Sequence, residues 1–187
     1  MSLMTESITS PAASTAAPGR SRWIVVAGLV AAIVLGIGGS IVHGGSGYTV
    51  AQHLSSLGMI TGTTLLAINF GRQSRYLVAA GFVLLALAEA IVLSAPVSIA
   101  GEATFASGVA LYVPALLLAS LPAGLPVWSR VVGGLAAIPF AVYAALNWLG
   151  QNPSPGGLVV TAGYVLLSVA AIGWIVHTLR NPAPASR

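Results

Sequence analysis

Long apolar runs alternate with short polar connections along the whole 187-residue chain. A helix needs roughly 20 apolar residues to cross the ~30 Å hydrocarbon core of a bilayer. Six runs meet this length, and the predicted spans are 23–42, 50–70, 76–97, 104–121, 131–149 and 158–179. Glycine and proline interrupt the sequence in nearly all of the connections, which is typical of turns. The pattern predicts an all-α integral membrane protein, with a six-transmembrane-helix bundle in residues 23–180.

The two ends of the chain are predicted to be tails. Residues 1–22 are rich in Ser, Thr, Ala and Pro, a composition that cannot bury enough apolar surface to fold. Residues 181–187 form a short second tail. The first span follows two arginines, as a signal peptide does, but it is too long for a usual signal peptide and lacks a clean cleavage site. We therefore expect an uncleaved signal anchor.

Composition excludes most soluble classes of protein. Apolar residues make up 57% of the chain and charged residues only 5%, with a mean hydropathy of +0.95. A soluble domain carries about a quarter charged residues. The sequence pI of about 10.1 reflects seven scattered arginines that form no basic patch, so no nucleic-acid partner is expected. Because there is no cysteine, disulfides, thiolate metal sites and cysteine catalysis are excluded.

The arginines predict the topology. If the spans alternate in direction, all seven arginines fall on one side, and the three connections on the other side carry none. Basic residues are retained on the cytoplasmic face, so both termini are expected in the cytoplasm, with the bundle in the inner (cytoplasmic) membrane. The arginines that anchor this topology are Arg20, Arg22, Arg72, Arg75, Arg130 and Arg180, with Arg187 at the end of the chain.

Glu89 is the only formally charged side chain inside a predicted span. It lies thirteen positions after Tyr76, beyond the midplane and toward the outer leaflet. An ionised carboxylate at such depth is costly unless it is paired. Its neighbours on the same helical face are apolar, so any partner must come from another helix. One hypothesis is a proton-coupling or cation-binding carboxylate in a polar cavity. The other is a protonated side chain that makes a structural hydrogen bond between helices.

The second span carries a polar face and a small-residue face. At 100° per residue, one face holds His53, Ser56, Thr63 and Thr64. Gly58 and Gly62 form a G-x-x-x-G on roughly the opposite face, where another helix can approach closely. If the second and third spans form a hairpin, His53 lies about one turn outward of Glu89. The alternative is that each hydroxyl bonds back to a carbonyl of its own helix.

Further polar side chains extend this candidate site. Tyr143 and Asn147 are one turn apart on the fifth span, and Tyr164 shares a face of the sixth span with Thr161 and Ser168. The candidate outward-facing polar site consists of Glu89, His53, Ser56, Thr63, Thr64, Tyr143, Asn147 and Tyr164. Individual polar side chains can instead act as hydrogen-bond links between helices, each worth about 0.6 kcal/mol.

A metal site is not expected, and no cofactor is predicted. The candidate ligands are His43, His53 and Glu102, which the topology places on one side of the membrane. Imidazole and carboxylate are suitable ligands for Zn or Cu. However, these residues lack any recognised ligand spacing, so we expect the histidines to contact headgroups or water.

The sequence leaves three functional classes open. There is no P-loop, G-x-S-x-G, H-E-x-x-H or Asp anywhere in the chain, so an enzyme is not expected. The first hypothesis is a transporter, channel or substrate-capture subunit that binds a small molecule or ion around Glu89. The second is an accessory, assembly or stress-related membrane protein that packs against copies of itself or other membrane subunits. The third, ranked last, is a haem- or metal-binding intramembrane protein. In each case the lipid bilayer is the surrounding partner.

Overall fold

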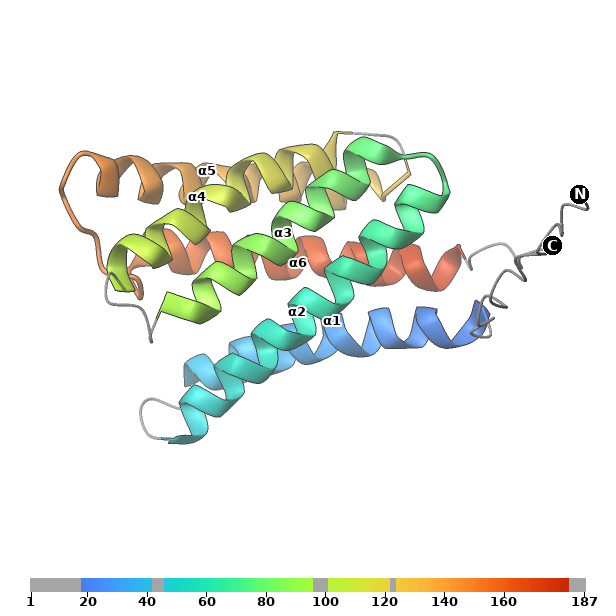
Figure 1. Cartoon of the computed structure of the whole chain (residues 1–187), viewed down its shortest axis with the longest axis horizontal. Coiled ribbons are helices and arrows are strands. Elements are labelled where there is room, and N and C mark those ends of the chain that lie inside the picture. The colour runs from blue at the N-terminus through green and yellow to red at the C-terminus, as the bar shows by residue number, and fades with distance from the viewer. Residues whose placement is uncertain (1–17, 42–45, 96–100, 122–123, 182–187) are drawn as a thin grey trace, which may run out of the picture.

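The computed structural model describes residues 18–41, 46–95, 101–121 and 124–181. The described chain forms helices α1 (Pro18–Ile41), α2 (Ser46–Arg72), α3 (Tyr76–Ser94), α4 (Gly101–Ser120), α5 (Val127–Trp148) and α6 (Leu158–Arg180) (Figure 1). Each of these six helices is long and apolar enough to cross a membrane. The predicted all-α fold with six potential membrane-spanning helices is therefore confirmed. The predicted N-terminal tail up to residue 17 and Arg187 lie outside the described residues.

Several helices are longer than the apolar runs that predicted them. α1 begins at Pro18, α2 at Ser46, α4 at Gly101 and α5 at Val127, each a few residues before the predicted start. The apolar run marks only the part of a helix that crosses hydrocarbon, whereas backbone hydrogen bonding continues into the polar region. Glu102 was expected in a connecting loop, but it lies in the first turn of α4. A carboxylate is favourable there because it faces the positive end of the helix dipole.

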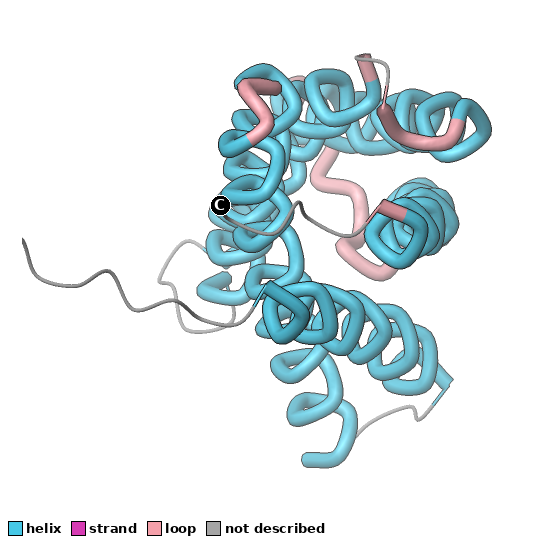
Figure 2. The backbone as a smooth tube through the Cα atoms, turned by 90° about the vertical axis from the view of Figure 1, so that its right-hand side faces the viewer, coloured by secondary structure: helices cyan, strands magenta, loops and turns pink. Residues whose placement is uncertain are grey.

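The helices form a ring in sequence order. Each one packs against the next, and α6 returns to pack against α1. Figure 2 shows this arrangement along the helix axes. In Figure 1 the α1–α2 hairpin diverges from α3–α6 toward the end that holds the α1–α2 connection.

Glycines set the closest helix contacts. A Cβ added to Gly58 in α2 would lie 2.6 Å from the carbonyl oxygen of Gly28 in α1, and one added to Gly62 would lie 2.9 Å from Leu29. The glycine face of the second span therefore packs against α1 of the same chain. Likewise, a Cβ on Gly81 in α3 would lie 2.5 Å from the backbone nitrogen of Ala119 in α4. The absence of a side chain allows these backbones to touch.

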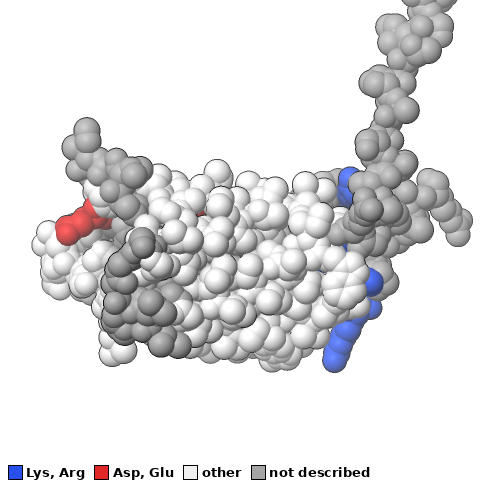
Figure 3. Space-filling model, turned by 90° about the horizontal axis from the view of Figure 1, so that it is seen from below, with Lys and Arg blue, Asp and Glu red and all other residues white. Residues whose placement is uncertain are grey.

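Charge divides the bundle into two ends. We call the end that carries Arg22, Arg72, Arg75, Arg130 and Arg180 the arginine end, and the end that carries Glu102 the acidic end (Figure 3). Between them the surface is apolar, with exposed side chains such as Val34, Leu87 and Ile138. Arg130 also caps α4, because its Nε and Nη2 donate to the carbonyl oxygens of Ser120 and Leu121 at 2.9 and 2.7 Å. The one-sided arginine pattern that the sequence predicted is thus present in the folded chain.

Candidate functional site

Glu89 is buried in the core and is hydrogen-bonded to two other helices. The hydroxyl of Ser56 in α2 donates to its Oε1 at 2.7 Å. The hydroxyl of Tyr112 in α4 donates to its Oε2. Glu89 is only 7% exposed, so these two hydrogen bonds provide polar partners that its apolar surroundings lack. Both partners come from other helices, as the apolar neighbours of Glu89 on α3 required.

This arrangement suits both protonation states of the carboxyl group. An ionised carboxylate only accepts hydrogen bonds, and it receives one on each oxygen from Ser56 and Tyr112. A protonated carboxyl must donate one bond, and a hydroxyl can accept as well as donate. Reversal of the Ser56 hydroxyl is enough to accommodate that proton. The hydrogen-bond geometry is therefore compatible with either protonation state of the carboxyl group.

Tyr112 is held in place by aromatic rings from α5 and α6. Its ring stacks on Phe140 with centroids 4.8 Å apart and meets Tyr164 edge-on at 5.9 Å. Phe140 and Tyr164 are themselves in edge-on contact at 5.3 Å. Tyr112 thus connects the carboxyl group of Glu89 in α3 to side chains of α5 and α6.

Sequence reasoning did not select Tyr112. A signal was present, because Tyr112 is a hydroxyl-bearing residue in the middle of an apolar helix, at a depth comparable to that of Glu89. Sequence patterns point to helix faces that carry several polar residues, and Tyr112 is not part of such a face. A single tyrosine on one helix and a single acid on another do not form a pattern that the sequence reveals as a pair.

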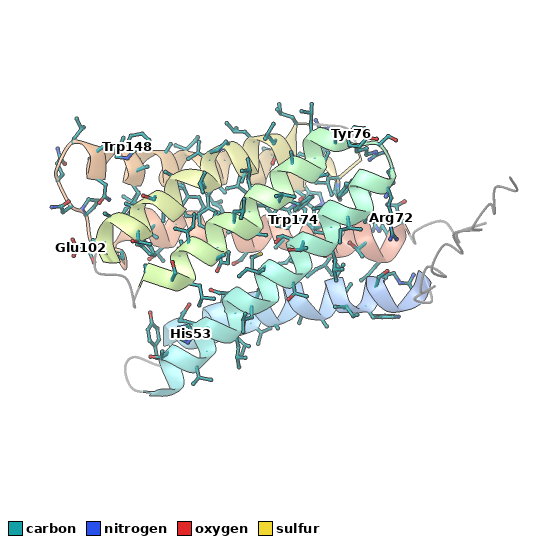
Figure 4. The ribbon with its side chains drawn as sticks, viewed as in Figure 1. His53, Arg72, Tyr76, Glu102, Trp148 and Trp174 are labelled. Atoms are coloured by element: carbon teal, nitrogen blue, oxygen red, sulfur yellow. The ribbon has the colours of Figure 1, made fainter. Side chains whose placement is uncertain are left out.

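A pocket of about 600 Å³ lies at the acidic end, and its lining includes Ser56 but not Glu89 itself. α2 contributes Gln52, His53 and Ser56 to its lining, and the beginning of α4 contributes Glu102 and Phe105. Figure 4 shows His53 and Glu102 at this same end of the bundle. Ser56 both lines the pocket and donates to Glu89. The pocket therefore ends at the hydroxyl that contacts the buried carboxyl group.

On the arginine side of Glu89, the core is filled with aromatic rings. Phe82 lies two turns below Glu89 on α3, stacked on Phe70 at 5.5 Å and edge-on to Trp174 at 5.0 Å. Phe70 also stacks on His177 at 5.6 Å. All four side chains are buried, and we call them the aromatic cluster. The polar pocket consequently stops near Glu89 and does not continue to the arginine end.

The remaining predicted polar residues are not gathered around Glu89. Thr63 is buried and donates to a carbonyl oxygen of its own helix at 2.7 Å, and Thr64 is exposed. Asn147 donates to the carbonyl oxygen of Tyr143 at 3.2 Å and lines a separate pocket of about 530 Å³. Thr63 thus bonds within its own helix, the alternative left open for the hydroxyls of the second span. Asn147 also bonds within its own helix, whereas the alternative considered for it was a link between helices. Tyr164 is the member that reaches the site, through Tyr112.

The metal-site candidates do not form a cluster in the described part of the chain. His53 and Glu102 both line the pocket, whereas His43 lies outside the described residues. Within the described ranges, no group of three or more His, Cys, Asp or Glu side chains is placed to hold a metal ion.

Comparison with known proteins identifies no relative of this chain. No known family model matches the chain. Searches among curated proteins and among solved structures also find no match. The function of the chain must therefore be inferred from its own geometry.

Proposed function

We propose that this protein captures or transports a small solute across the cytoplasmic membrane, with no reaction chemistry of its own. In this proposal the acidic end faces the outside, both termini face the cytoplasm, and the solute enters the pocket that ends at Ser56. The observation that carries the proposal is the direct hydrogen bond between this pocket-lining hydroxyl and the buried Glu89.

A buried carboxyl group at this depth supports a functional role. Intramembrane acids are expensive and usually mark a solute or ion pathway. Glu89 retains its position with two hydroxyl partners on neighbouring helices, and an open pocket leads to one of them. A purely structural link between helices needs no access from the surface.

The aromatic cluster favours capture or alternating access over an open channel. Its rings close the arginine half of the bundle, so a solute bound at Ser56 has no polar path onward in this conformation. The alternative of an accessory protein that acts through helix packing would use glycine-rich helix faces. Of these, the face of Gly58 and Gly62 contacts α1 of the same chain, so it is not free to bind a partner.

The proposal can be tested by cysteine protection, because the chain has no native cysteine. Gln52→Cys places a thiol in the pocket lining, and Gln151→Cys places one on the exposed α5–α6 connection as a control. Both variants are labelled from outside with a membrane-impermeant methanethiosulfonate. Labelling is repeated with choline, acetate, glycerol or glycine present in turn, and any protecting solute is then offered to proteoliposomes in radiolabelled form.

We expect one of these solutes to slow labelling at position 52 without slowing it at position 151. Protection and uptake should both decline when Glu89→Gln is added to the Gln52→Cys background, since glutamine keeps the side-chain size but removes the titratable group. If position 52 is not labelled from outside, or if every solute leaves its labelling rate unchanged, the proposed function is wrong.

A further inference from the structure

We infer that the solute bound in this pocket is a small organic cation. The inference rests on the proposed function, because it names the ligand class of the same site. Three features of the lining point to it: its charge, its apolar wall and its size.

The charge around the pocket favours a positive ligand. Glu102 lines its mouth and Glu89 lies directly behind Ser56, whereas no arginine belongs to the lining. His53 is also part of the lining. The chain contains no lysine, and the arginine side chains that the structure describes lie at the opposite end of the bundle (Figure 3). This separation makes the acidic end attract cations and repel anions as they approach.

The walls of the pocket are suited to an organic group rather than a hydrated metal ion. Tyr48 and Phe105 contribute aromatic rings, and Val92, Leu93 and Pro155 contribute apolar surface. An ammonium group gains about 0.5–2 kcal/mol from the face of an aromatic ring, and its alkyl substituents gain from apolar contact. A metal ion instead needs several strong ligands, and the described residues provide no cluster of three His, Cys, Asp or Glu side chains.

The size of the pocket supports the same ligand class. Sites for small organic molecules have volumes of about 300–1,000 Å³, and this pocket has about 600 Å³. A single ion would leave most of that volume to water. An alkylated ammonium ion can place its charge toward Ser56 and Glu89 while its substituents contact Phe105 and the apolar wall.

The test compares choline with 3,3-dimethyl-1-butanol, which has the same shape but carries carbon in place of the charged nitrogen. Binding of each probe to the purified full-length protein in nanodiscs is measured by calorimetry. Glu102→Gln removes the charge at the mouth of the pocket. Gln151→Lys is the matched control, because it changes the net charge by the same amount at the same end, on an exposed residue outside the lining.

We expect choline to bind at least about tenfold more tightly than its neutral analogue, and Glu102→Gln to weaken choline about threefold or more. Gln151→Lys should have a clearly smaller effect. Equal binding of the two probes, or no binding of choline, would overturn the inference. The proposed function still stands if acetate, glycerol or glycine protects the cysteine at position 52, so the two failures are distinguishable.

Discussion

Two glycines of α1 provide a matched test of the helix packing. A Cβ on Gly28 would lie 2.8 Å from the carbonyl oxygen of Gly58 and 3.3 Å from the backbone nitrogen of Gly62. The first distance is 0.6 Å shorter than the 3.4 Å at which ordinary van der Waals contact begins. A Cβ on Gly38, in the same helix, would meet no atom within 4 Å. The same substitution at these positions therefore differs only in the contact between α1 and α2.

The expected magnitude follows from two opposing effects. Alanine stabilises a helix relative to glycine by up to about 1 kcal/mol, and this gain applies to Gly28→Ala and Gly38→Ala alike. At Gly28 the added methyl group must also push α1 away from α2, and such overpacking costs about 1–3 kcal/mol. We expect the free energy of unfolding of Gly28→Ala to be lower than that of Gly38→Ala by this amount.

Reversible unfolding in mixed micelles of dodecyl maltoside and dodecyl sulfate gives the two free energies. The four tryptophans of the chain report the transition through their fluorescence. Gly38→Ala should be as stable as the unmodified protein or slightly more stable. If the two variants unfold at the same detergent fraction, α1 does not lie against Gly58 and Gly62 as described.

Three further predictions concern the site, a turn and the topology. Tyr112→Phe keeps the ring but removes a hydrogen bond to the buried carboxyl group, and it should lower the free energy of unfolding by about 1.5–3 kcal/mol in the same assay. Gly124 has a φ of +145° and would direct a side chain into Arg75, so Gly124→Ala should cost about 1–3 kcal/mol. If the acidic end faces outside, an impermeant maleimide should label Gln151→Cys in intact cells but label Gln73→Cys only after permeabilisation; the reverse pattern would contradict the topology.

The helices and the charge pattern could be predicted because they depend on local sequence. An apolar run of sufficient length is enough to indicate a membrane-spanning helix. The arginines occur only near the two chain ends and in every second connection between spans. This placement is enough to predict that they lie at one end of the bundle. Helix ends were less accurate, as the inclusion of Glu102 in α4 shows, because a helix continues where its apolar run has already stopped.

The site could be predicted only in part. Glu89 was identifiable from its charge alone, and Ser56 was one of four polar residues on a single face of α2. Selecting Ser56 rather than His53 requires the crossing angle of α2 on α3, which is set by the contacts between these two helices. The role of Tyr112 requires the rotation of α4 about its axis. The crossing angle and the rotation both result from contacts between helices, and these contacts cannot be read from the sequence.

The aromatic cluster also has an electrical consequence. Moving one elementary charge across a membrane potential of 100 mV involves about 2.3 kcal/mol, and the potential falls mainly across material that excludes water. In this bundle the water-accessible pocket extends inward to Ser56, whereas Phe70, Phe82 and Trp174 fill the core beyond it. In the proposed function, a cation that enters the pocket therefore crosses only the smaller part of the potential. Its onward passage through the aromatic half would cross most of it, and that step would respond most strongly to membrane voltage.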